Sequence, residues 1–136
     1  MMTIKVSAFI LFLVSMNLYG QNLIGYSETD IRQYMIENQK SMTFENFINN
    51  STFKYLKYSD KAETQTLLFF LNEKLVCKSI RLVCDKSLKT EKIKECNSLY
   101  RKTGDNQWSQ TKKGKSYLIE MKEEEWSFNV TITLNE

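Results

Sequence analysis

The clearest pattern in the chain is the alternation of apolar and polar side chains near its C-terminus. From Trp126 to Leu134 every second residue is large and apolar, and the residues between them are small and polar. Successive side chains of a β-strand point to opposite faces, so this pattern predicts a strand with one buried face. Five other segments are strand-like and are joined by short polar turns, which predicts antiparallel pairing. They are residues 53–59, 64–72, 75–84, 107–112 and 116–122.

Two segments instead repeat their apolar residues at helical spacing. The first follows Ser27, a capping hydroxyl three residues ahead of Asp30, and is predicted as a helix over residues 28–39. The second begins near Thr90 and ends before Gly104, with Arg101 and Lys102 at its C-terminal end. Its apolar stripe consists of Ile93, Cys96, Leu99 and Tyr100. Residues 42–52 are predicted as a short strand and a turn.

The two halves of the chain share an element order. Residues 67–84 and 117–134 agree in the parity of their apolar positions, and a predicted helix precedes each set. The helix starts at Ser27 and Thr90 lie further apart in the sequence than the two matching sets of strands do. The difference places an insertion in the first half, between Lys40 and Phe53. We therefore predict an α+β fold in which two helices pack on one face of an antiparallel sheet. A helix-plus-three-strand unit is repeated twice in it, over residues 27–84 and 90–134.

This order of elements resembles that of known folds. Tandem helix-plus-meander units resemble the architecture of beta-lactamase-inhibitory proteins, and a single unit resembles small outer-membrane assembly lipoproteins. The resemblance lies in element order and carries no motif residues. It implies a fold and transfers no function.

The N-terminus has the pattern of a secretory signal peptide. Lys5 precedes an apolar run from Val6 to Met16, and Gly20 precedes Gln21. A spanning helix needs roughly 20 apolar residues, so we expect removal of residues 1–20 rather than a membrane anchor. The pattern resembles that of exported proteins of Gram-negative bacteria. It predicts a periplasmic or secreted protein with one domain over residues 21–136 and no membrane span after the signal is removed.

Composition narrows the chemistry that the chain can perform. Its 136 residues include three Cys and no His, and the formal net charge of the chain is +3. The lack of His removes the commonest general base at neutral pH and a frequent metal ligand. Three Cys without a tight C-x-x-C spacing do not predict a zinc site, and interspersed charges of both signs are not typical of a nucleic-acid-binding protein. We expect no metal, no cofactor and no nucleic-acid partner.

Strand parity assigns side chains to the two faces of the predicted sheet. The face under the helices is expected to hold Leu67, Phe69, Leu71, Val76, Ile80, Leu82, Ile119, Val130 and Ile132. The opposite face is mostly polar, with Cys77 and Ser79 among its residues. Its exception is an apolar patch that is typical of a contact site. The predicted binding residues are the patch itself, Leu68, Phe70 and Leu118, and the neighbouring Arg81 and Glu120 as a charged pair.

An alternative for this patch is that residues 42–52 fold over it. Phe44 and Phe47 in that segment would then build a second small core with Phe70. A cover of this kind would also protect an aggregation-prone apolar run.

The cysteines allow one argument from parity. Cys77 and Cys84 are an odd number of residues apart, so a regular strand points them to opposite faces and they should not bond each other. Cys84 shares the helix-facing parity, and Cys96 lies on the apolar stripe of the second helix. One interpretation is a Cys84–Cys96 disulfide formed in an oxidising compartment, and the other is two buried reduced thiols.

Two classes of function remain. The first is a non-enzymatic exported binding or structural module for a protein, a peptide or a glycan of the cell envelope. The second is a thiol- or carboxylate-dependent envelope enzyme without His, with Cys77 as nucleophile or Glu120 paired with Asp105. No base adjoins Cys77, and the carboxylates show no meaningful spacing. The prediction is therefore a binding module and not an enzyme.

Overall fold

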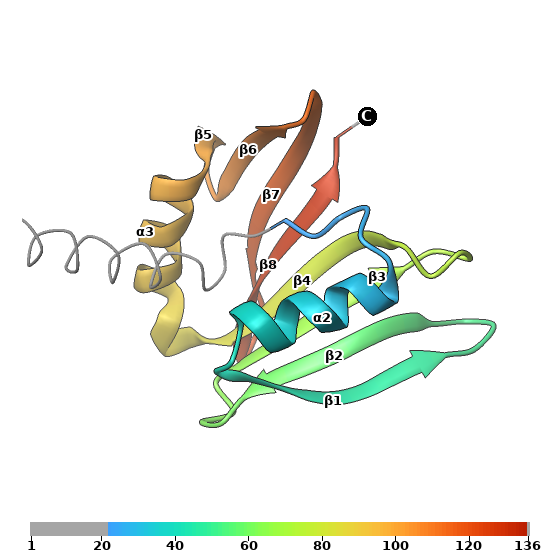
Figure 1. The fold of residues 1–136 in the computed structure, drawn as a ribbon. Helices are drawn as coiled ribbons and strands as arrows, with labels where there is room; N and C mark the ends of the chain where they lie inside the picture. The colour runs from blue at the N-terminus through green and yellow to red at the C-terminus, as the bar shows by residue number, and fades with distance from the viewer. Residues whose placement is uncertain (1–21, 136) are drawn as a thin grey trace, which may run out of the picture.

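The computed structural model describes residues 22–135, and one antiparallel β-sheet dominates it (Figure 1). Within these residues the sheet has eight strands in the order β1-β2-β3-β4-β8-β7-β6-β5. The strands are β1 (Met42–Asn49), β2 (Lys54–Asp60), β3 (Gln65–Leu71), β4 (Cys77–Asp85), β5 (Arg101–Gly104), β6 (Gln107–Lys112), β7 (Lys115–Glu123) and β8 (Ser127–Leu134). The predicted signal peptide lies outside the described residues.

Two short α-helices accompany the sheet in this part of the chain. Helix α2 (Glu28–Asn38) begins at Ser27, whose Oγ accepts a hydrogen bond from the Asp30 backbone N–H at 3.1 Å, so the predicted N-cap is confirmed. Helix α3 (Lys89–Leu99) follows a 3₁₀ turn, η1 (Lys86–Leu88). Helix α2 buries Ile31 and Met35, and α3 buries Lys92 and Cys96.

The predicted fold, two helices on one face of a sheet built from a repeated helix-plus-three-strand unit, is wrong. The described residues form one eight-stranded antiparallel sheet, and each α-helix is only 11 residues long. The segment taken as an insertion is the edge strand β1, and the polar segment after α3 is the opposite edge strand, β5. The strands therefore outweigh the helices, and a three-strand unit does not describe either half.

Neither edge strand has the alternation that reveals a strand clearly in the sequence; the sequence predicts a short strand within residues 42–52, where β1 lies, and none at β5. A bulge between Phe44 and Asn46 breaks the register of β1 against β2, and a bulge shifts which residues face each side. Strand β5 has four residues and buries none of them. Edge strands have one neighbour and need less apolar surface, so their sequence pattern is weak.

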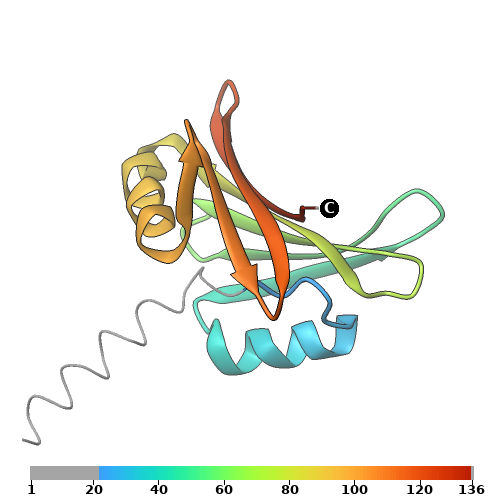
Figure 2. The same cartoon turned by 90° about the horizontal axis from the view of Figure 1, so that it is seen from above.

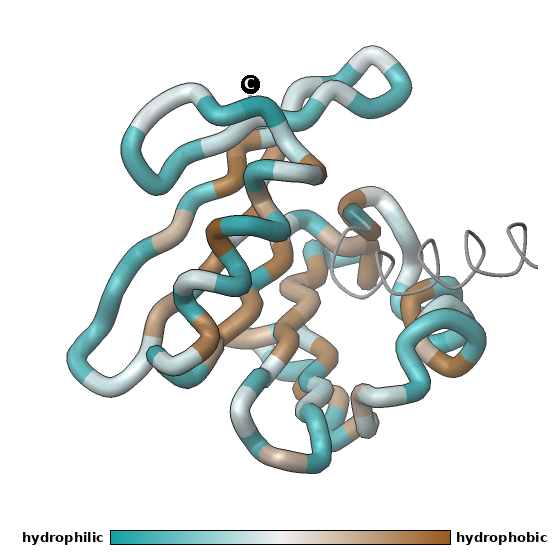
Figure 3. The backbone as a smooth tube through the Cα atoms, turned by 90° about the vertical axis from the view of Figure 1, so that its left-hand side faces the viewer, coloured by the Kyte–Doolittle hydropathy of each residue, from teal (hydrophilic) through white to brown (hydrophobic). Residues whose placement is uncertain are grey.

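The core lies against one face of the sheet. The strands contribute fully buried side chains that include Leu56, Phe69, Ile119 and Phe128. Hydrophobic positions follow the strands in the interior, whereas hydrophilic residues dominate the connecting loops (Figure 3). The sheet twists strongly between its two edges (Figure 2), as the right-handed twist of its strands requires.

Trp108 connects the sheet to α3. It is fully buried on β6, and its indole Nε1–H donates a hydrogen bond to Oδ1 of Asn97 on α3 at 2.9 Å. A buried indole N–H normally finds such a partner because leaving it unpaired is costly. The contact holds the helix against the edge half of the sheet.

The predicted position of Cys77 is wrong for a local reason. Phe70 pairs with Ser79, but the next residue, Leu71, pairs with Cys77, so β4 bulges at Lys78. Because of the extra residue, Cys77 lies on the same face of the sheet as Leu71, and the Cys77 side chain is buried. Parity counted along the sequence places it on the opposite face, because an inserted residue exchanges the faces beyond it.

Candidate functional site

The face of the sheet opposite the core carries only partly buried or exposed side chains at the centre of the central strands. We call it the open face, and two cross-strand rows define it. The first row is Lys57, Leu68, Arg81, Thr131 and Glu120, and the second is Tyr55, Phe70, Ser79, Thr133 and Leu118. These side chains are held in fixed register by five adjacent strands, β2, β3, β4, β8 and β7.

Three of the predicted binding residues lie together on this face. Leu68 pairs with Arg81 across the β3–β4 ladder, and the Arg81 guanidinium lies 5.3 Å from the centroid of the Phe70 ring. The ring of Tyr55 on β2 lies 5.9 Å from the same ring on the other side. We call Tyr55, Leu68, Phe70 and Arg81 the Phe70 cluster. Sequence reasoning missed Tyr55, although the β2–β3 hairpin register would have placed it opposite Phe70.

The other two predicted residues lie farther along the same rows. Thr133 separates Leu118 from Ser79, and Thr131 separates Glu120 from Arg81. No Arg81–Glu120 ion pair forms within residues 22–135; Glu120 instead accepts a hydrogen bond from Nε2 of Gln107 at 3.1 Å. Strand β8 inserts between β4 and β7, a strand order that parity cannot reveal.

Strand β1 does not cover the open face, so the alternative in which residues 42–52 fold over Phe70 is wrong. The ring of Phe44 packs edge-on against Tyr58 at 5.5 Å, and Tyr58 packs in turn against Phe69 of the core. The Arg32 guanidinium of α2 lies 4.5 Å from the Phe44 ring centroid. The aromatic residues of β1 therefore lie on the helix side of the sheet.

The loops of the β1–β2 and β3–β4 hairpins enclose a recess beside the Phe70 cluster. Its volume is about 390 Å³, and its lining includes Phe53, Phe70, Lys54, Glu73 and Lys78. Phe53 is 57% exposed. We call this space the hairpin recess, and it continues the aromatic surface of the open face to the end of the sheet.

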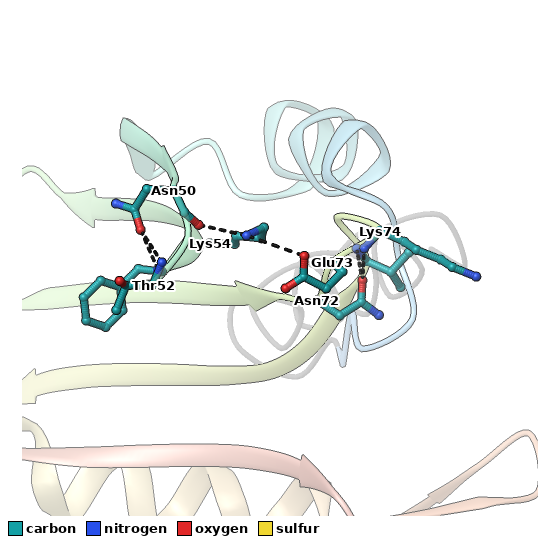
Figure 4. A network of polar contacts seen from close by, with 8 residues as sticks. Asn50, Thr52, Lys54, Asn72, Glu73 and Lys74 are labelled. Atoms are coloured by element: carbon teal, nitrogen blue, oxygen red, sulfur yellow. Dashed lines mark hydrogen bonds and ion pairs between the residues drawn. The ribbon is translucent and has the colours of Figure 1, made fainter.

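Hydrogen bonds hold both loops of the recess in shape (Figure 4). Oδ1 of Asn50 accepts from the backbone N–H groups of Thr52 and Phe53, and Oδ1 of Asn72 accepts from those of Lys74 and Val76. These are Asx turns, in which a side chain replaces a backbone acceptor. The recess is therefore bordered by ordered loops.

One ion pair links the two loops across the recess. Nζ of Lys54 donates to the Asn50 carbonyl at 2.8 Å and lies 3.9 Å from a carboxylate oxygen of Glu73 (Figure 4). Arg81, which lies over the Phe70 ring, and Lys78, which lines the recess with Phe70, form no ion pair within residues 22–135. The surface around Phe70 thus combines aromatic rings with two cations that form no ion pair in the described part of the chain.

The three cysteines are buried thiols, and Cys84 and Cys96 are not bonded to each other. Burial raises the pKa of Cys77 and Cys84 to about 12 and that of Cys96 to about 11. Each thiol is therefore protonated at neutral pH, and the thiolate is the reactive form. This environment does not favour Cys77 as a nucleophile.

Residues 22–135 contain no cluster of three or more His, Cys, Asp or Glu that could hold a metal ion. None of their helices has the length and apolar character needed to cross a membrane.

Comparison with protein-family models, with curated proteins and with solved structures finds no match to this chain. A function for it therefore rests on its own residues and their geometry.

Proposed function

We propose that the protein is an exported, non-enzymatic binding module that holds an acidic segment of a partner protein against the open face of its sheet. The observation that carries this proposal is the Phe70 cluster with its cation Arg81, next to Lys78 of the hairpin recess; neither cation has an ion-pair partner in the described chain. A peptide that offers carboxylates and apolar side chains would complement both features.

The composition of the cluster supports a protein partner. Tyr, Phe and Arg are enriched at the centres of protein–protein interfaces, where they supply area and cation–π contacts. Phe70 and Tyr55 remain partly exposed although they contact each other at 5.9 Å. A partner would bury the remaining area of both rings.

The position of the cluster also supports recognition. Its side chains project from paired strands and not from loops, so little conformational entropy is lost when a ligand orders them. The hairpin recess beside it offers Phe53 and Lys54 as a second contact. An extended acidic peptide could lie along the cluster and end in the recess.

Truncation of the central ring tests the proposal. Phe70→Ser should lower the free energy of unfolding by about 1–2 kcal/mol, since the ring keeps part of its surface exposed, and not by the roughly 3–5 kcal/mol expected for a fully buried ring. The same variant should bind a labelled Glu-rich peptide containing Leu and Phe at least tenfold more weakly, measured by fluorescence anisotropy. A loss of stability near the upper range would show that Phe70 belongs to a core.

Charge reversal provides the matched control. Arg81→Glu removes the cation beside Phe70, whereas Lys40→Glu makes the same change in net charge at an exposed site after α2. Arg81→Glu should weaken binding of the acidic peptide at least tenfold, and Lys40→Glu should leave it within about twofold, because screening weakens distant surface charges. Equal effects, or tighter binding of a neutral glycan than of the peptide, would contradict the proposal.

We further infer export, on the basis of Lys5, the apolar run from Val6 to Met16, and Gly20 before Gln21. The intact mass of the protein recovered from the cell envelope should correspond to a chain that begins at or near Gln21. A mass that retains Met1 or Met2 would contradict signal removal and favour an anchor over residues 6–19.

A further inference from the structure

The hairpin recess opens where two strands of the sheet part. Strand β2 begins at Lys54 and β3 ends at Leu71, but the pairing of the two strands begins only at Tyr55 and Phe70. Lys54 and Leu71 instead line the recess. The paired part of the two strands therefore closes the inner end of this space.

The recess offers an apolar wall to a ligand. Phe53, Phe70 and Leu71 line it, and Phe53 is 57% exposed. Small-ligand sites typically combine such a wall with a few polar groups, and a volume of about 390 Å³ lies within their usual range. The space is sufficient for one residue with a side chain as large as Leu or Phe.

The charged groups of the recess favour an anion. Among the described residues its charged lining consists of Lys54, Lys78 and Glu73, so two cations face one carboxylate. Lys78 is exposed and forms no ion pair within residues 22–135. One carboxylate group from a ligand would make the recess neutral.

The contact between Lys54 and Glu73 is open to exchange. Their charged atoms lie 3.9 Å apart, whereas a charge-assisted hydrogen bond to a carboxylate spans about 2.7–2.9 Å. The Glu73 side chain is 91% exposed and that of Lys54 only 17%. The Asn50 carbonyl takes one of the three N–H groups of the Lys54 ammonium. A ligand carboxylate can therefore bond Lys54 directly while Glu73 turns into solvent.

We propose that the hairpin recess binds the free C-terminal carboxylate of the partner segment, with the last, apolar side chain of that segment against Phe53 and Leu71. This inference rests on the function proposed for the open face and names the end of the segment that is recognised. The carboxylate pairs with Lys54 and Lys78 and displaces Glu73. A chain end fits because the paired strands close the inner end of the recess, so a segment that enters across the Phe70 ring cannot continue through it.

Peptides that differ only at their last group test the proposal. The labelled Glu-rich peptide with Leu and Phe is made with a C-terminal Phe, once as the free acid and once as the amide. Binding to the purified protein is followed by fluorescence anisotropy. The free acid should bind at least fivefold more tightly than the amide.

A second amide controls for net charge. It carries one extra internal Glu, which gives it the net charge of the free acid, and it should bind within twofold of the first amide. If it matches the free acid, or if all three peptides bind equally, the inference is overturned while the proposal of an acidic partner segment stands. Failure of all three peptides to bind would overturn both.

Lys78→Gln tests the location of the carboxylate. It should reduce the preference for the free acid over the amide to less than twofold. Lys74→Gln is the matched control in the same hairpin, because Lys74 does not line the recess and its side chain extends away from Lys54 and Glu73 (Figure 4). This control should keep at least a fivefold preference. Equal preferences in the two variants would overturn the site.

Glu73→Gln tests the exchange at Lys54. The preference for the free acid should widen at least threefold, because no carboxylate of the protein then competes for the Lys54 ammonium. Lys54→Gln should reduce the preference to less than twofold, and its amide can still donate to the Asn50 carbonyl. An unchanged preference in both variants would overturn the assignment of Lys54.

Discussion

Ile80→Asp should leave the protein largely unfolded. Ile80 lies on the central strand β4, is 5% exposed, and pairs with Phe69 on one side and Ile132 on the other. An aspartate there would bury a charge without a partner, at a cost of about 4 kcal/mol or more. Small domains have roughly 5–15 kcal/mol of stability in total, so most of it would be lost. Far-UV circular dichroism with urea titration measures the effect.

The residue next to it is the control. Ser79→Asp changes a partly exposed position on the open face and should cost less than about 1 kcal/mol. The same contrast should appear on β8, where Val130→Asp is expected to unfold the protein and Asn129→Asp to be tolerated. Equal tolerance in both pairs would contradict this assignment of faces on β4 and β8, and a reversed order would mean that the faces are exchanged, because a shift of one residue exchanges them.

Trp108→Ala should lower the free energy of unfolding by roughly 3–5 kcal/mol. Trp108 is 0% exposed and donates the hydrogen bond to Asn97 that joins β6 to α3. Its loss leaves a large void and removes the partner of a polar group. Chemical denaturation followed by circular dichroism measures the change.

The second tryptophan of the chain is a matched control. Trp126 is 83% exposed, so Trp126→Ala should change the free energy of unfolding by no more than about 0.5 kcal/mol. The sequence pattern alone ranks both tryptophans as strand residues. Similar losses in the two variants would contradict the packing of β6 under α3.

The sequence by itself determined most of the central strands, the N-cap of α2, and the adjacency of Leu68, Phe70 and Arg81. These features depend on local rules. Alternation of apolar residues predicts which face is buried, short turns predict antiparallel neighbours, and Ser27 satisfies an N–H group that a helix start leaves free. Each rule involves residues that are close in the sequence or joined by one hairpin.

Only the tertiary structure decided the order of the strands and the position of Cys77. Strand β8 pairs with β4 across a large separation in sequence, and no local pattern specifies that choice. The bulge at Lys78 and the bulge in β1 change parity without a sequence signal.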